Sequence, residues 1–192
     1  MMDFNAYKSD LISTLSRVEP NSIELVVQSI LKTRKGGGTV FVAGNGGSAA
    51  TASHMATDLM FGSKLVNPSL KVFSLNDNNS IITATGNDIG FEHLFTRQLQ
   101  FLSNPGDLVI LISASGNSPN ILKCIEICKP SGLQTVGLVG FDGGKLSKLV
   151  DVLVHVPTEK GKYGIVEDIH MIIGHAITQL LRDQADLESV DK

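Results

Sequence analysis

Two segments near the N-terminus carry apolar residues at helical spacing. The first covers residues 4–17 and the second covers residues 20–36. In the second, Ile23, Val26 and Ile30 recur three or four positions apart, as on one face of an amphipathic helix. A run of three glycines follows, which is a common way for a helix to end. We therefore predict two amphipathic helices at the start of the chain.

Beyond these helices, short apolar runs alternate with helical patterns. The runs are rich in β-branched residues and lack polar alternation, as in strands buried on both faces. They cover residues 39–43, 70–75, 108–113, 135–140 and 151–156. The helical stretches cover residues 49–61, 92–101, 117–128 and 165–182. This alternation predicts a single α/β domain over residues 1–192, a doubly wound five-stranded parallel sheet flanked by helices. We expect the polar last ten residues to fray.

Composition narrows the class of protein. The apolar share of 42% excludes a disordered chain. The net charge of −3 shows no basic surplus, so we expect no nucleic-acid partner. No run reaches the 18 apolar residues of a membrane helix, and the start has no apolar signal core. Cys124 and Cys128 lie four apart on a helical pattern, where they read as small apolar residues. We expect a reducing, cytoplasmic compartment.

A glycine-rich loop follows the first predicted strand and opens a helix. It reads Gly44-Asn45-Gly46-Gly47-Ser48. Parallel sheets bind ligands at the carboxyl ends of their strands, where free helix N–H groups attract anions. The loop matches neither the P-loop nor the G-x-G-x-x-G pattern, so we expect no nucleotide. Two alternatives stay open: a dinucleotide site with Asp77 as the acidic residue, and a tight turn without a ligand.

A second polar loop follows the predicted strand 108–113. Ser113, Ala114, Ser115, Gly116, Asn117 and Ser118 precede a helix. Three hydroxyls beside a helix N-terminus form a cradle of neutral donors, which suits a phosphate monoester. Serine is also an ordinary N-cap, but capping alone does not require three hydroxyls within six residues. We predict that this loop binds phosphate.

These motifs together resemble a known family. The segments GNGGSAATASH, GND, SASGNS, GFDGGKL and EDIHMIIGH are similar to those of the sugar isomerase (SIS) domain. Within that family, the chain resembles the phosphoheptose isomerases. These enzymes convert sedoheptulose 7-phosphate to glycero-manno-heptose 7-phosphate. The resemblance implies a homotetramer with sites at subunit interfaces and a zinc ion. It also implies that residues 1–37 form a helical hairpin on the sheet and the subunit interface.

The resemblance also assigns roles to residues. Ser113, Ala114, Ser115 and Ser118 would hold the sugar phosphate. The sugar itself would be lined by Asn45, Gly46, Gly47, Ser48, Asn87, Asp88, Asp58 and Glu167. Four residues match the metal and acid/base positions: His54, Asp58, Glu167 and His175. Of these, Asp58, Glu167 and His175 would be catalytic. The structural alternative is that His54 is a partly buried helix histidine bonded to a carbonyl, and that His175 is a structural histidine in the apolar stretch IIGHAI.

Two of these positions depart from the family pattern. Asp58 stands where relatives carry the glutamate that moves a proton between C1 and C2, and Glu167 stands where they carry glutamine. We hypothesise that Asp58 keeps the metal while Glu167 shares or takes over the base role. Within one continuous helix, however, Glu167 and His175 would lie roughly 12 Å apart along the axis. They could not then both reach a single ion in a simple way. Two alternatives stay open: Glu167 lies before the helix proper, or the two residues serve different parts of the site, as across a subunit interface.

The chemistry of the predicted reaction matches the residues. Aldose–ketose isomerisation through an enediol needs a base, an acid and polarisation of the carbonyl. A carboxylate with histidine, with or without a metal ion, supplies these functions. Two other functions compete: a non-catalytic SIS protein that holds a replication initiator, and a sugar-phosphate-sensing regulator. The ionisable groups at the matching positions favour an enzyme.

Overall fold

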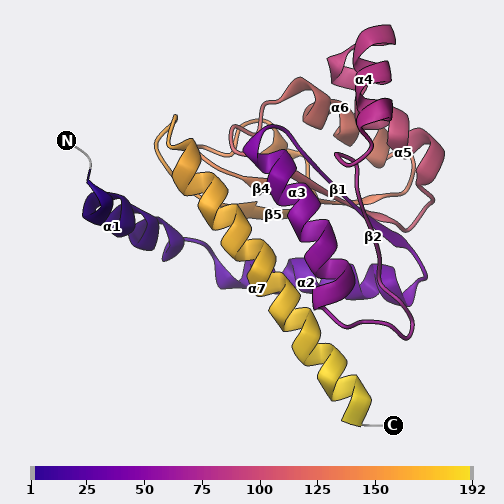
Figure 1. Ribbon diagram of the computed structural model, residues 1–192, viewed down its shortest axis with the longest axis horizontal. Coiled ribbons are helices and arrows are strands. Elements are labelled where there is room, and N and C mark those ends of the chain that lie inside the picture. The colour runs from indigo at the N-terminus through magenta and orange to yellow at the C-terminus, as the bar shows by residue number, and fades with distance from the viewer. Residues whose placement is uncertain (1–2, 191–192) are drawn as a thin grey trace.

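The fold is built on one parallel sheet. The computed structural model describes residues 3–190 (Figure 1). The strands are β1 (Thr39–Gly44), β2 (Lys71–Ser74), β3 (Leu108–Ser113), β4 (Gln134–Val139) and β5 (Val152–His155). They pair in the order β2-β1-β3-β4-β5, and all pairs are parallel. This confirms the predicted five-stranded parallel α/β fold.

The strand order creates a switch point between β1 and β3. The chain moves from β1 outward to β2, then returns to place β3 on the other side of β1. Loops that leave the carboxyl ends of β1 and β3 therefore diverge to opposite faces of the sheet and leave a crevice between them. The two polar loops singled out in the sequence, Gly44–Ser48 and Ser113–Ser118, follow these two strands directly.

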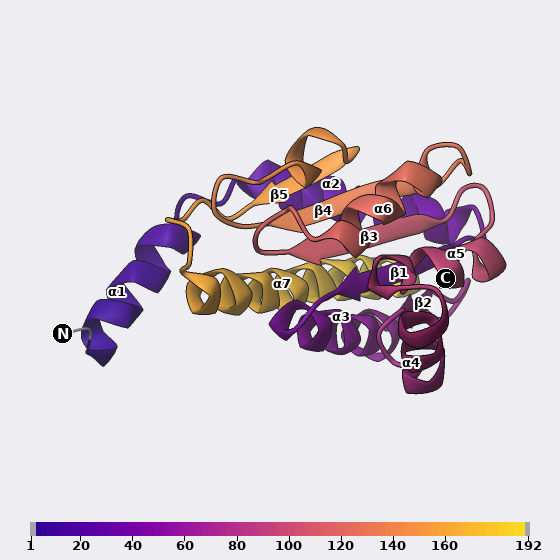
Figure 2. The same ribbon diagram turned by 90° about the horizontal axis from the view of Figure 1, so that it is seen from above.

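Helices cover both faces of the sheet (Figures 1 and 2). One core lies between the sheet and α2 (Pro20–Lys35), α3 (Gly47–Thr57) and α7 (Tyr163–Val190). The other lies under α5 (Thr96–Leu102) and α6 (Pro119–Cys128). The central strand β3 is buried along its whole length. Its continuous apolar sequence therefore reflects burial on both faces.

Cys124 and Cys128 are buried free thiols of the second core. Burial raises the pKa of the Cys128 thiol to about 12. Both cysteines therefore serve as small apolar residues, as the sequence predicts.

Helix α3 does not continue as one α-helix. The stretch predicted as 49–61 divides into α3 and a π-helical turn over Asp58–Gly62, which places Asp58 at the junction. Single π-turns inside helices are frequent at functional sites. Two short 3₁₀ turns, Phe91–His93 and Leu146–Lys148, complete the connections.

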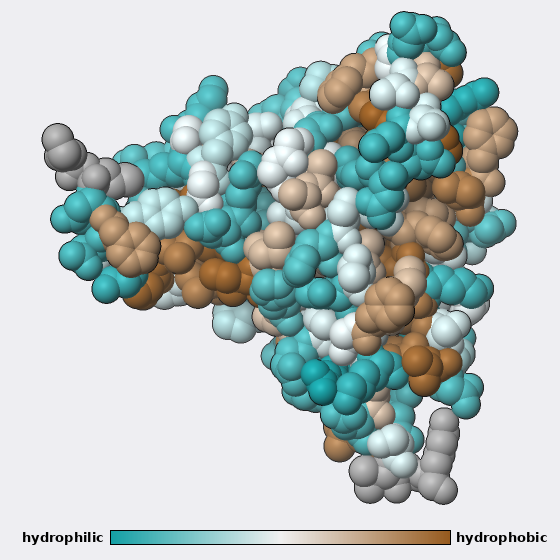
Figure 3. Space-filling model, viewed as in Figure 1, coloured by the Kyte–Doolittle hydropathy of each residue, from teal (hydrophilic) through white to brown (hydrophobic). Residues whose placement is uncertain are grey.

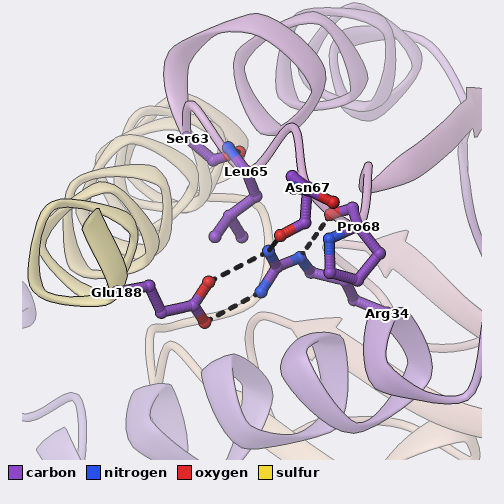
Figure 4. A network of polar contacts seen from close by, with 6 residues as sticks. All are labelled: Arg34, Ser63, Leu65, Asn67, Pro68 and Glu188. Atoms are coloured by element: carbon purple, nitrogen blue, oxygen red, sulfur yellow. Dashed lines mark hydrogen bonds and ion pairs between the residues drawn. The ribbon is translucent and has the colours of Figure 1, made fainter. Parts of the chain in front are cut away.

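Two parts of the chain differ from the sequence prediction. Residues expected to be a loop form helix α4 (Asn79–Asp88), whose N-cap Asn78 accepts a hydrogen bond from Ile81 N. Of the last ten residues, expected to fray, residues 183–190 continue α7, and residues 191–192 lie outside the described part of the chain. The reason is a long-range ion pair: Arg34 on α2 binds Glu188 on α7 at 2.9 Å (Figure 4).

The two leading helices part from one another. Helix α2 packs on the sheet, whereas α1 (Phe4–Leu15) projects from the body and contacts α7 (Figures 1 and 2). Tyr7 of α1 donates a hydrogen bond to Asp168 of α7 at 2.6 Å, and Lys162 pairs with Asp10 at 2.9 Å. The hairpin expected over residues 1–37 is therefore open in the single chain. Within residues 3–190, no helix is long and apolar enough to cross a membrane.

Candidate active site

A polar pocket lies at the switch point, between the two predicted loops. It has a volume of about 140 Å³ and contains six of the predicted substrate-binding residues together with Glu167. Its lining comprises Asn45, Ser48, Ile112, Ser113, Ala114, Ser115, Ser118, Tyr163 and Glu167. No lysine or arginine is among these residues. A ligand in this pocket would therefore meet neutral hydrogen-bond donors and one carboxylate.

The serine loop turns its hydroxyls toward the start of α6. Ser113 Oγ lies 3.3 Å from Ser118 Oγ and accepts a hydrogen bond from Gly116 N. Ser115 Oγ accepts one from Asn117 N. Ser118 occupies the N-cap of α6 but makes no capping hydrogen bond with its side chain. Its hydroxyl contacts Ser113 Oγ instead of capping the helix, so capping does not account for this serine.

The glycine loop brings the N-terminus of α3 to the same pocket. Gly46 is the N-cap with φ of 56°, a left-handed conformation that favours glycine. The Glu167 carboxylate occupies the space that a Cβ atom at Gly47 would need. A carboxylate at a helix N-terminus is favoured by the helix dipole and the free N–H groups. Asn45 is held by reciprocal amide hydrogen bonds with the buried Asn120, at 2.8 and 2.9 Å.

A second cluster of functional groups lies farther along α3 and α7. His54 and His175 face each other with their Nε2 atoms 2.9 Å apart. Asp58 Oδ2 lies 3.3 Å from His54 Nε2 and 3.6 Å from His175 Nε2. All three side chains are partly open to solvent. We call these three residues the His/Asp/His cluster.

This cluster fits a metal ion. Zinc binds nitrogen and oxygen ligands at about 2.1 Å, so neighbouring ligand atoms in a tetrahedral site are about 3.4 Å apart. The three separations of 2.9, 3.3 and 3.6 Å are consistent with that spacing. The three converging atoms leave a fourth position open, as in catalytic sites. The residues present are therefore suited to a divalent ion.

The serine pocket and the His/Asp/His cluster lie one after the other along the same pair of helices. Helices α3 and α7 pack side by side, with Glu167 against Gly47 and Gly174 against Met55. Glu167 precedes His175 by eight residues of continuous helix, which is about 12 Å along the axis. Glu167 therefore lines the serine pocket and does not belong to the His/Asp/His cluster. Within residues 3–190 of the single chain, three residues of the predicted metal set converge on one point: His54, Asp58 and His175.

Two predicted sugar-binding residues lie elsewhere. Asn87 and Asp88 end helix α4, are exposed, and form a hydrogen bond with each other at 2.7 Å. They do not line the switch-point pocket. Sequence reasoning also missed Asn120 and Tyr163. Tyr163 lies four residues before Glu167, so helical spacing places both on one face and is the signal that points to it.

Comparisons with known proteins agree with this geometry. The SIS domain model matches residues 3–140. A phosphoheptose isomerase of Aneurinibacillus thermoaerophilus is 42% identical over 161 residues, which is 84% of this chain and 80% of that protein. One from Chlorobaculum parvum is 37% identical over 91% of this chain and 84% of that protein.

Solved structures show the same relationship. The phosphoheptose isomerase of Neisseria gonorrhoeae superimposes with a TM-score of 0.85 at 28% identity, covering 93% of this chain and 96% of that chain. The structure from Francisella tularensis gives 0.86 at 27% identity, with the same coverage. The sequence similarity and the agreement in overall fold both point to the same group of proteins. The chain therefore belongs to the SIS domain family, within its phosphoheptose isomerase group.

Proposed function

We propose that the protein is an aldose–ketose isomerase that converts sedoheptulose 7-phosphate to D-glycero-D-manno-heptose 7-phosphate. The observation that carries the proposal is the spacing between the serine pocket and the His/Asp/His cluster. Along α3 they are six residues apart, from Ser48 to His54, or about 9 Å. Along α7 they are about 12 Å apart. With carbon–carbon bonds of about 1.5 Å, an extended seven-carbon chain spans about 10 Å from C1 to its phosphate.

The serine pocket binds the phosphate end in this proposal. Ser113, Ser115 and Ser118 offer hydroxyl donors, and the N-termini of α3 and α6 offer backbone N–H groups. Glu167 accepts a hydrogen bond from a sugar hydroxyl, because a carboxylate facing the phosphate itself would repel it. Asn45 and Ser48 form the wall on the α3 side, and Gly46 and Gly47 shape the turn that joins them. A role for Asn87 and Asp88 would require a second subunit.

The reacting carbons lie at the His/Asp/His cluster. The Asp58 carboxylate contacts both imidazoles through Oδ2, which leaves Oδ1 for proton transfer. Oδ1 takes a proton from C1 of the ketose, the O2 carbonyl oxygen gains a proton, and the enediol forms. The proton returns from Oδ1 to C2 while O1 becomes the aldehyde oxygen. Without an ion, Nε2 of His175 and of His54 would serve the oxygens, one as the acid for O2 and the other as the base for O1; with an ion bound, both Nε2 atoms would be ligands and the ion would take over the polarisation of the oxygens. Glu167 lies too far along α7 to act at these atoms.

We further propose that His54, Asp58 and His175 hold a divalent ion, with zinc suited to this ligand set. Such an ion would polarise the substrate carbonyl as a Lewis acid. The spacing of the ligand atoms supports this proposal. Within one chain, Glu167 lies about 12 Å along α7 from His175, so we propose the ion site without it.

A non-catalytic SIS binding protein is the alternative function. Such a protein needs the serine pocket but has no use for converging acid/base groups. In this chain the cluster is complete, with all three ligand atoms turned toward one point. That arrangement favours the enzyme.

The test compares two matched carboxylate variants with sedoheptulose 7-phosphate as substrate. We expect Asp58→Asn to lower kcat by more than about 100-fold. Glu167→Gln should keep kcat within a few-fold of wild type and change KM. Aldose product is followed by chromatography with and without a chelator. A large loss of kcat in Glu167→Gln would identify Glu167 as the base. If the wild type shows no turnover, the non-catalytic binding protein becomes the favoured function.

We also propose that the chain assembles as a homotetramer, and the cytoplasmic location stays a prediction. The projecting helix α1 supports assembly, because Phe4 and Ile12 are 78% and 61% exposed. Figure 3 shows hydrophobic surface on this arm. Exposed apolar side chains at this density mark interaction surfaces. Sedimentation velocity would check the proposal, and a monomer at micromolar concentration would contradict it.

A further inference from the structure

Tyr163 is the one aromatic side chain in the lining of the serine pocket, within residues 3–190. It begins α7 one turn before Glu167 and is 51% exposed. Its hydroxyl forms no hydrogen bond with any residue in that range. Because His175 lies farther along the same helix, Tyr163 stands at the end of the pocket remote from the His/Asp/His cluster. This is the phosphate end in the proposed function.

The Tyr163 ring is supported by Phe141. The two rings meet edge to face, with centroids 4.9 Å apart and an interplanar angle of 85°. Phe141 is buried and follows β4, on the loop that packs against the serine loop. This geometry is a favourable aromatic pair, worth more than burial alone. It restricts the orientation of a tyrosine that would otherwise be free at the pocket mouth.

The backbone of Phe141 is strained. Its φ of 51° lies in the left-handed region, which is a costly conformation for a bulky residue. The carbonyl oxygen of Phe141 accepts a hydrogen bond from His155 Nε2 at 2.9 Å. Since a carbonyl can only accept, Nε2 carries the proton. The fold thus holds Phe141 in a strained conformation that turns its ring toward Tyr163.

We propose that Tyr163 donates its hydroxyl hydrogen to the phosphate of the substrate, and that Phe141 is a positioning residue that orients the tyrosine. The inference rests on the proposed function for the identity of the ligand. Its physical basis is the absence of lysine and arginine from the pocket lining. In a pocket that binds a dianion with neutral donors alone and also contains the Glu167 carboxylate, each additional donor strengthens binding.

The experiment measures binding of inorganic phosphate by calorimetry to the full chain, so that it does not depend on turnover. We expect Tyr163→Phe, which removes only the hydroxyl, to weaken phosphate binding about 10- to 100-fold. Phe141→Leu should weaken it about 2- to 10-fold, because the edge-to-face contact is lost. In the double variant, Phe141→Leu should have no further effect, since it acts through the hydroxyl. Phe101→Leu, at an exposed aromatic on α5, is the control and should bind as wild type.

Two results would overturn the inference. One is wild-type phosphate affinity in Tyr163→Phe. The other is an equal effect of Phe141→Leu with and without the Tyr163 hydroxyl, which would make Phe141 a packing residue only. Unfolding midpoints of all variants are measured alongside, and Tyr163→Phe tests the hydroxyl even if Phe141→Leu does not fold. If the wild type binds phosphate but does not isomerise the heptose, the proposed function fails while the phosphate contact is still tested.

Discussion

At the residue scale, two glycines of one loop serve different purposes. The sequence suggests that Gly44 and Gly47 both let a ligand approach the backbone. In the structure, a Cβ at Gly44 would collide with the backbone of Ser48, whereas a Cβ at Gly47 would collide with the Glu167 carboxylate. The first glycine is needed for the turn from β1 into α3. The second is needed to seat a side chain that lines the pocket.

This distinction yields a matched pair of substitutions. Gly44→Ala should destabilise the protein by more than about 2 kcal/mol, because backbone atoms cannot move aside without strain. Gly47→Ala should change the free energy of unfolding by less than about 1 kcal/mol, because Glu167 can rotate away and alanine favours the helix. It should nevertheless raise KM for the sugar phosphate. Urea unfolding and steady-state kinetics measure both effects. Equal destabilisation by the two variants would show that Glu167 is not free to move.

At the element scale, the strands were predictable and several helix boundaries were not. Each strand is an apolar run buried on both faces, so its own residues define it. Helix α4 lacks such a signal: its sequence, NSIITATGND, mixes turn formers with β-branched residues, and its Asn78 cap is equally consistent with a turn. The end of α7 depends on Arg34, which is about 150 residues away in the chain. Local patterns cannot show such a partner.

The same limit applied to the site. Spacing predicted the separation of Glu167 from His175 for the case of one continuous helix, and α7 does contain both residues. It could not show that α3 and α7 bring His54 and His175 within 2.9 Å, since this requires the packing of two helices distant in sequence. Nor could it find Asn120, which holds Asn45 through two hydrogen bonds from a position 75 residues away in the chain.

The contacts of Arg34 allow a test of what holds the C-terminal end of α7 in place. The Arg34 guanidinium is buried and binds Glu188 at two points and the carbonyls of Asn67 and Pro68 (Figure 4). Arg34→Ala should cost about 3 kcal/mol in unfolding free energy, because it leaves a carboxylate and two carbonyls without their donor. Hydrogen exchange at residues 183–189 should rise at the same time.

Two comparisons sharpen this prediction. Glu188→Gln should cost less than Arg34→Ala, because Glu188 is about half exposed and the carbonyl contacts persist. Arg97→Ala, at an arginine that contacts Phe101 on the surface, is the control and should cost less than about 1 kcal/mol. Wild-type exchange rates in Arg34→Ala would mean that the helix end is held by other contacts.

At the scale of the whole molecule, the site is assembled where the two cores meet. Helices α3 and α7 belong to the core on one face of the sheet and α6 to the core on the other. The pocket takes residues from α3 and α7 and the N-cap Ser118 of α6. A substitution that disturbs the packing of either core should therefore also change the shape of the pocket. The stability of the sheet thus affects the geometry of the site. A buried histidine of α7 links this stability to pH.

His170 is completely buried, and neither ring nitrogen makes a well-aligned hydrogen bond. Burial lowers the pKa of His170 from 6.5 to about 4. Its interaction with the Val139 backbone raises the pKa, but by less than burial lowers it. The folded-state pKa is thus depressed, so the unfolded chain takes up a proton first as the pH falls below 6.5. The stabilising contribution is complete above that pH and is lost as the pH falls toward 4. Between pH 7 and pH 5 the loss should be about 2 kcal/mol.

Replacement of His170 by an apolar residue should remove this dependence. In His170→Leu or His170→Met, the unfolding free energy at pH 7 should stay the same or rise, because two buried polar atoms without partners are eliminated. The fall between pH 7 and pH 5 should shrink by about 2 kcal/mol in urea titrations with a chelator present. His93→Gln, at a partly exposed histidine, should keep the wild-type slope. An unchanged slope in both His170 variants would show that this histidine accepts a proton in the folded core and that the acid sensitivity arises elsewhere.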